Sequence, residues 1–498
     1  MTNLSTKVCV LTGLKDYSEL IAPFGPDSAY PEFVGCPWAA PSMSANPVYE
    51  GVRQSLVGLG LDKARFGSPA WNPLRELVQA SGRVTIKPNM VRHWNENQNG
   101  SWQSVVTHWS VVRPLIDYAL LAVSPTGRVL IGDAAQWDCN MDVLNGLLEV
   151  PSVLAHYETT APGQVRFADF RREYFDRAGP IKSDRHSLPG DPLGYVEVDL
   201  GDFSAFNDPK LDPERFFSSE HDNTRTVESH SNGHHRYLIS KSCLDCDLFI
   251  NVPKLKTHHL LGISVAMKNL VGINGDKNLL PHYRIGFVDE GGDQHPARTF
   301  PFMIREMLFK VLRPILRAGL LVKPFGYALG LLHKLGGRNV YAGGSWIGND
   351  TVWRMALDLN RILLFAGIDG AISSSGQDRR YLTIVDGIIA GEGEGPMAPQ
   401  DRLTGAILAA GSPFTCDLVA ARVMGFDVQR LKLIVEGMRD HPLPLNPIKT
   451  LDDLDLAFYD IDSGAWTDLN WQFLPKWDFL PPVGWQELVQ HNEKGHHD

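Results

Sequence analysis

The sequence predicts an α/β protein whose mostly parallel sheet is flanked by helices and holds a functional site at the carboxyl ends of its strands. Short apolar runs at 84–89 (VTIKPN), 128–135 (RVLIGDAA) and 248–252 (LFINV) lack an amphipathic period, which is typical of strands buried in a parallel sheet. Between the first two, residues 110–123 repeat apolar side chains at helical spacing. A strand, a helix and a second strand in this order predict a right-handed parallel crossover.

The α/β pattern resumes later in the chain. We expect a helix at 346–366, a strand at 381–390, and a strand followed by a helix at 405–425. The sequence divides into five parts: 1–80, an N-terminal extension packed on the core; 81–300, the first part of the α/β core with a polar insertion near 160–235; 301–345, a basic amphipathic helical insertion; 346–430, the second part of the core; and 431–498, a tryptophan-rich tail that packs on the body.

Composition narrows the class of protein. The chain has 498 residues, 43% of them hydrophobic, which is enough for two or three domains. Its net charge of −10 argues against a general nucleic-acid binder, which needs a basic face. No secretory signal pattern or apolar run of transmembrane length occurs, and the six cysteines are scattered. We therefore expect a cytoplasmic protein with no nucleic-acid partner.

Residues 246–282 contain the strongest functional signal. An apolar strand ends at Pro253 and is followed by cations and amides among glycines. Ligands of open α/β sheets bind at the carboxyl ends of strands, so this segment predicts an anion site. The residues that we expect to bind an anionic substrate are Lys87, Asn89, Lys256, Lys268, Asn269 and His282. A solvated, lysine-rich loop is the alternative interpretation.

The lysines need a counter-ion, because clustered ammonium groups lower one another's pKa. A phosphate or carboxylate ligand would supply the negative charge, with glycine N–H groups completing the site. Alternatively, the lysines pair with protein carboxylates, namely Asp133, Asp276 and Asp386. The sequence leaves this choice open.

Acidic residues and histidines at other predicted strand ends add candidate chemistry. Carboxylates at several strand ends beside an anion site are typical of a magnesium or manganese centre. The candidate metal ligands are Asp133, Asp386, Glu392 and Glu394. Histidine titrates near neutrality and suits acid–base catalysis. The candidate catalytic residues are His108, His258 and Lys254.

A series of short motifs resembles the domain-of-unknown-function family 362. In order, the motifs are IKPN at 86–89, TH at 107–108, GDA at 132–134, NVPKLKTH at 251–258, MKNLVG at 267–272, VDGI at 385–388 and EGEGP at 392–396. The similarity runs from about residue 84 to residue 425. The chain lacks the appended ferredoxin-like cysteine cluster that we associate with this family, so no iron–sulfur cluster is expected.

A more distant similarity is to the nickel-pincer lactate racemase family. That resemblance implies a lysine that holds a nucleotide-derived pincer, histidines that bind nickel or move a proton, and racemisation of a 2-hydroxy acid. The matching positions here are Lys254 or Lys268 for the lysine, and His108, His258 and His282 for the histidines.

These observations favour an enzyme that acts on a small phosphate- or carboxylate-bearing molecule, with a divalent metal (Mg, Mn or Ni) as a candidate cofactor. The alternatives are a racemase- or epimerase-like metalloenzyme and a non-catalytic protein that binds an anionic ligand or cofactor. The sequence contains no GxxxxGK[ST], GxSxG or HExxH motif, which disfavours P-loop NTPases, α/β-hydrolases and zincins.

The segment 301–345 differs from the rest of the chain in charge. It contains seven basic residues and one acid, a net charge of +6, which leaves −16 for the remainder. Apolar residues interleaved with cations are typical of a helix that lies on an anionic membrane. A basic lid over the site or an oligomer interface would have the same pattern. We therefore expect peripheral membrane contact, a lid over the site or an oligomer interface.

Overall fold

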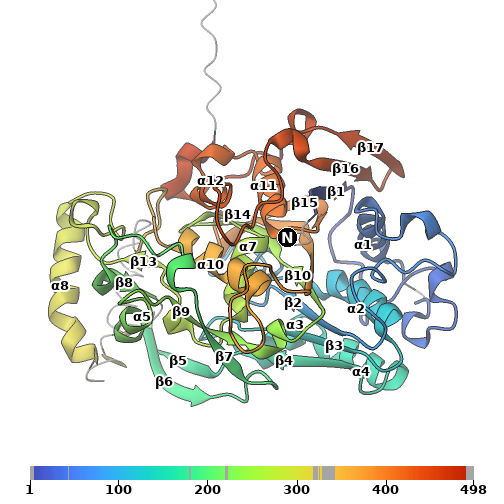
Figure 1. Cartoon of the computed structure of the whole chain (residues 1–498), viewed down its shortest axis with the longest axis horizontal. Helices are drawn as coiled ribbons and strands as arrows, with labels where there is room; N and C mark the ends of the chain where they lie inside the picture. The colour runs from blue at the N-terminus through green and yellow to red at the C-terminus, as the bar shows by residue number, and fades with distance from the viewer. Residues whose placement is uncertain are drawn as a thin grey trace, which may run out of the picture.

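The computed structural model describes residues 5–42, 44–178, 181–218, 223–317, 323–324, 326–327 and 343–489. The fold centres on an eleven-stranded sheet (Figure 1). Nine strands follow the order β17-β16-β1-β15-β14-β10-β2-β3-β4, and β11 and β12 extend from β14. The strands are β1 (Lys7–Thr12), β2 (Arg83–Pro88), β3 (Arg128–Asp133), β4 (Val165–Asp169), β10 (Leu248–Val252), β11 (Lys254–His258), β12 (Gly262–Ser264), β14 (Arg380–Glu394), β15 (Ala398–Ala410), β16 (Asp455–Asp460) and β17 (Ala465–Leu469).

The sheet is mixed, so the prediction of a mostly parallel sheet is wrong. Along the order β14-β10-β2-β3-β4, each strand is parallel to the next. In contrast, β15 is antiparallel to both β14 and β1, and β17 is antiparallel to β16. Only residues 395–397 separate β14 from β15. A parallel connection needs a crossover of a dozen or more residues, so this short link makes the pair antiparallel.

Helices cover both faces of the sheet (Figure 1). One face packs against α1 (Pro47–Gly58), α2 (Trp109–Val123), α3 (Met141–Leu147) and α4 (Val150–Thr160). The other packs against α7 (Ala266–Asn269), α10 (Val352–Phe365), α11 (Pro413–Val423) and α12 (Lys432–Gly437). Successive side chains of β1 alternate between the two cores, since Val8 and Val10 join the second and Cys9 and Leu11 the first.

The expected polar insertion near 160–235 contains regular structure. It contributes β4 to the main sheet and strands to three two-stranded sheets. In these, β5 (Glu173–Ala178) pairs with β6 (Ile181–Ser187), β7 (Tyr195–Asp199) pairs with β9 (Arg236–Ser240), and β8 (Phe216–Phe217) pairs with β13 (Tyr283–Arg284). The insertion also contains the short helix α5 (Thr224–Ser229), and α6 (Lys241–Leu244) follows β9.

Both ends of the chain contribute strands to the main sheet. From the expected N-terminal extension, β1 lies between β15 and β16, and the C-terminal region supplies β16 and β17. The basic insertion at 301–345 is described only in part, by α8 (Phe300–Arg317) and a few later residues. Most of 318–342 lies outside the described residues. No described helix combines the length and apolar character needed to cross a membrane.

Candidate anion-binding site

A small cavity lies at the carboxyl ends of β2, β3 and β11, where α/β proteins commonly bind ligands. It encloses about 60 Å³, which is space for a few water molecules. Helix α7 and the 3-10 helix η7 (Leu270–Ile273) form part of its wall. The polar lining residues are Asn89, Asp133, Gln136, Lys256, His258, Ser264, Lys268, Asn269 and Lys277. Six of these belong to the site that the sequence predicts.

Lys87 and Asp133 form a buried ion pair in the cavity wall. Lys87 Nζ lies 2.8 Å from Asp133 Oδ1, and the backbone N–H of Met90 donates to Asp133 Oδ2 at 2.7 Å. Gly272 of η7 packs directly on this pair, and its carbonyl accepts a hydrogen bond from the N–H of Ala134. Lys87 therefore has a carboxylate partner within the protein, although its charge still acts on the pKa of the nearby Lys268.

Replacing Gly272 with alanine is expected to destabilise the fold by about 3 kcal/mol. An ideal Cβ at this position would lie 1.7 Å from Asp133 Oδ1 and 2.6 Å from Lys87 Nζ, so either the ion pair or η7 must move. Urea unfolding measures the loss. The matched control is Gly146→Ala in α3, where an added Cβ meets nothing within 4 Å and helix propensity favours alanine by roughly 0.5–1 kcal/mol. Equal stability of both variants would contradict this close packing.

Three further lysines bring positive charge to the cavity. Lys256 Nζ donates to the carbonyl of Val105 at 2.5 Å and weakly to Asn89 Oδ1 at 3.4 Å. Lys277 Nζ donates to two carbonyls, those of Ala134 and Val271. All four acceptors are neutral. Among the described residues, Lys268 Nζ has neither a hydrogen bond nor an ion pair.

The pKa values of these lysines reflect this excess of cations. Burial, followed by the charges of Lys277 and Lys87, lowers the pKa of Lys268 to about 7. Burial also lowers the pKa of Lys277 to about 7, although Asp133 opposes the shift. The pKa of Lys256 falls well below its usual value because of burial and the neighbouring Lys254 and Lys268. A bound anion would offset these costs.

Two histidines lie beside the lysines in their neutral form. His258 lines the cavity, and its Nδ1 accepts a hydrogen bond from the N–H of Leu260 at 3.0 Å. His282 Nδ1 donates to the carbonyl of Leu280 at 2.7 Å, which leaves a lone pair on Nε2. Burial, and next the charge of Lys268, lowers the pKa of both rings, that of His282 to about 3. Neither ring therefore adds a positive charge near pH 7.

Two amide side chains connect the cavity wall to the sheet. Asn269 Nδ2 donates to Asn251 Oδ1 at 2.7 Å, and Asn251 Nδ2 donates to the carbonyl of Ala266 at 2.8 Å. Because Asn251 belongs to β10, these bonds hold α7, and with it Lys268, against the strand.

A known protein family matches the part of the chain that supplies several residues of this site. Residues 212–422 match the family model of DUF362, a domain of unknown function. This confirms the resemblance over that span, and no curated protein matches the chain. The DUF362 span supplies Lys256, Lys268 and Lys277, whereas Asn89 and Asp133 precede it. The nickel-pincer resemblance stays a prediction.

Lys254, also within the DUF362 span, belongs to a separate buried cluster. Its Nζ lies 2.9 Å from Asp386 Oδ2 and 3.0 Å from the Tyr17 hydroxyl. Tyr17 also donates to Asp386 Oδ1, and its ring stacks on His108. The backbone N–H of His108 donates to Asp386, and burial lowers the pKa of the ring to about 3. Lys254 and His108 are therefore brought together, but neither lines the cavity.

The four candidate metal ligands are not brought together. Asp133 and Asp386 each pair with a lysine. Glu392 Oε2 accepts the N–H of Leu480, and Glu394 Oε1 accepts the N–H of Val483, so both hold the C-terminal segment. Across the described ranges, no three His, Cys, Asp or Glu side chains form a group that could hold a metal ion. A divalent cofactor remains a prediction.

Three of the polar lining residues were not assigned to a site from the sequence, namely Gln136, Ser264 and Lys277, and neither were the contacting residues Gly272 and Tyr17. Lys277 lies in the predicted segment only nine residues after Lys268, so the cluster of cations was a usable signal. Gly272 and Tyr17 had no such signal, because their contacts with Asp133 and Asp386 join positions far apart in the chain.

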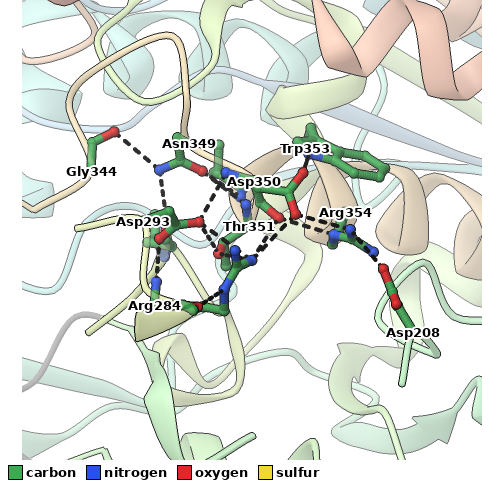
Figure 2. A network of polar contacts seen from close by, with 12 residues as sticks. Asp208, Arg284, Asp293, Gly344, Asn349, Asp350, Thr351, Trp353 and Arg354 are labelled. Atoms are coloured by element: carbon green, nitrogen blue, oxygen red, sulfur yellow. Dashed lines mark hydrogen bonds and ion pairs between the residues drawn. The ribbon is translucent and has the colours of Figure 1, made fainter. Parts of the chain in front are cut away.

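A second polar network surrounds Asp293 and Asn349 (Figure 2). Asp293 accepts hydrogen bonds from the backbone N–H of Asp350 at 2.9 Å and the hydroxyl of Thr351 at 2.6 Å. Asn349 Nδ2 donates to the carbonyl of His282 at 3.0 Å. These contacts tie the loop that contains His282 to the start of α10. They fix the backbone of His282, which lies near Lys268.

Proposed function

We propose that the protein is an enzyme that binds the phosphate or carboxylate group of a small molecule in the lysine-lined cavity. The observation that supports this most strongly is Lys268, a buried ammonium with no described counter-charge. Burying an unpaired charge is costly. A bound oxyanion would remove that cost, whereas a purely structural role for Lys268 would give the fold no benefit.

The cavity matches an anionic group in size and in donors. About 60 Å³ accommodates the head group of a ligand, while the rest of the molecule would extend through the mouth. The partly exposed lining residues Gln136, Val271 and Pro396 mark that side. Lys256 and Lys277 are already oriented by carbonyl acceptors and offer their remaining N–H groups.

The same residues support proton transfer. A lysine whose pKa is about 7 exists in both protonation states near neutral pH, which suits a general acid or base. His258 supplies a neutral imidazole in the same cavity. Ionisable groups with strongly shifted pKa values in a cavity are characteristic of catalytic sites. We therefore assign Lys268 and His258 to proton transfer on the bound substrate.

The direct test is calorimetric titration with sulfate, inorganic phosphate and small carboxylates such as lactate, at constant ionic strength. We expect saturable binding of at least one of these anions, and a rise in melting temperature that follows ligand concentration. If sodium chloride at equal ionic strength gives the same rise, the effect is general screening and the proposal fails.

Anion affinity is expected to decrease as pH rises. The ammonium form of Lys268 binds the anion and is lost above about pH 7, as is that of Lys277, so sulfate affinity should fall by at least roughly tenfold per pH unit above that point. Sulfate is the suitable probe because its own charge is constant in this range. Calorimetry in buffers of different ionisation enthalpy should show proton uptake on binding. An affinity that does not change with pH would exclude Lys268 as the binding cation.

A further inference from the structure

Helix α8 presents a row of apolar side chains to solvent. Phe300, Met303, Ile304, Met307 and Val311 recur at spacings of three and four residues and are between 40% and 72% exposed. This spacing places them on one helix face. A contiguous exposed apolar face of this kind usually marks an interaction surface.

The opposite side of α8 is anchored to the body of the protein. Phe302 is buried and its ring stacks on His295 with centroids 4.5 Å apart. His295 Nε2 also lies 3.1 Å from Glu306 Oε1. These contacts orient the helix with its apolar face outward, at the outer edge of the molecule (Figure 1, left).

The charge of this region indicates what covers the apolar face. Within 300–317 there are four basic residues and one acid, a net charge of +3, in a chain of −10. Lys310, next to the apolar face in sequence, is exposed. A second copy of the chain would bring an equally basic helix to this face, so like charges would meet. An anionic lipid surface offers both acyl chains for the apolar residues and negative head groups for the cations.

We propose that α8 is a peripheral membrane anchor, which lies in the head-group region of an anionic bilayer with its apolar face toward the acyl chains. This goes beyond the proposed function and does not depend on it. Because the rest of the chain is negatively charged, it would be repelled from the same surface. The helix therefore also sets which side of the protein faces the membrane.

Vesicle co-sedimentation tests the proposal. The full chain should pellet with vesicles that contain phosphatidylglycerol at low salt, and much less with phosphatidylcholine alone or at high salt. The double variant Met307→Glu/Val311→Glu should lower the partition coefficient at least about tenfold. The control is Phe473→Glu, which changes an apolar side chain that is 71% exposed elsewhere and should pellet like the wild type.

Other results would overturn the proposal. Recovery of the wild type in the supernatant, or equal pelleting of the α8 variant, would exclude α8 as the anchor. Light scattering measures the oligomeric state. If the wild type is a dimer that does not bind vesicles, and the α8 substitutions dissociate it, this face contacts a second copy of the chain. Both variants change exposed residues, so their melting temperatures should match the wild type, and sulfate titration should be unaffected.

Discussion

Lys268→Met is expected to weaken sulfate binding and to stabilise the protein at the same time. Losing one charge-assisted contact costs about 1.5–3 kcal/mol, or roughly 10- to 150-fold in affinity. Removing a buried, unpaired ammonium should stabilise the fold by on the order of 1–4 kcal/mol. A structural residue would show the opposite, because removing it would destabilise the fold.

The stabilisation should depend on pH. The folded-state pKa of Lys268 is lowered to about 7 from 10.5, so below about pH 7 the wild type bears the full cost of the buried charge. As pH rises above 7, the folded protein releases this proton while the unfolded chain still holds it, and the cost declines. The gain from Lys268→Met should therefore be larger at about pH 6 than at about pH 9.

Urea unfolding at both pH values and sulfate calorimetry measure these effects. Lys210→Met, at an exposed lysine, is the control and should change neither quantity appreciably. A Lys268→Met variant that loses stability and retains sulfate affinity would show that the lysine is structural.

Lys254→Met is expected to act in the opposite way, with a loss of about 3–5 kcal/mol in unfolding free energy. Lys254 and Asp386 are both fully buried, and Lys254 Nζ lies 2.9 Å from the carboxylate. The substitution would leave Asp386 with only the Tyr17 hydroxyl and backbone N–H groups as partners. Those donors do not cancel its charge.

The double variant Lys254→Met/Asp386→Asn separates this mechanism from simple loss of packing. Removing both charges should recover much of the stability, because neither charge is then buried alone. Unfolding curves of the two single variants and the double variant give the coupling energy. Additive losses would contradict an ion-pair role. Sulfate affinity of the folded Lys254→Met variant should stay near that of the wild type, since Lys254 does not line the cavity.

The strands of the parallel half were predictable because their signals are local. The apolar runs at 84–89, 128–135 and 248–252 each correspond to a strand, and a run that is buried on both faces needs no information from the rest of the chain. The antiparallel half was not predicted. Its direction depends on the short link between β14 and β15. The strand that we expected at 381–390 is longer in the structure, since β14 extends to Glu394 and leaves only three residues before β15.

In the candidate site, too, some features follow from local sequence and others depend on contacts between distant residues. Sequence order alone placed Lys256, His258 and Lys268 near one strand end, because they lie within fifteen residues of each other in one segment. It could not tell which lysines have a carboxylate partner. Asp133 and Asp386 are far from their lysines in the chain. The pairing with protein carboxylates applies to Lys87 and Lys254, and an anionic ligand for the other lysines stays a proposal.

The sequence by itself therefore determined the α/β class, the strands of the parallel region and the segment rich in cations, since each depends on neighbouring residues. Only the tertiary structure decided which charges remain without a partner. It paired Lys87 with Asp133 and Lys254 with Asp386, and it left Lys268 buried without a described counter-charge. Whether an ammonium group has a partner depends on a few ångströms between distant strands, and no local pattern encodes that distance.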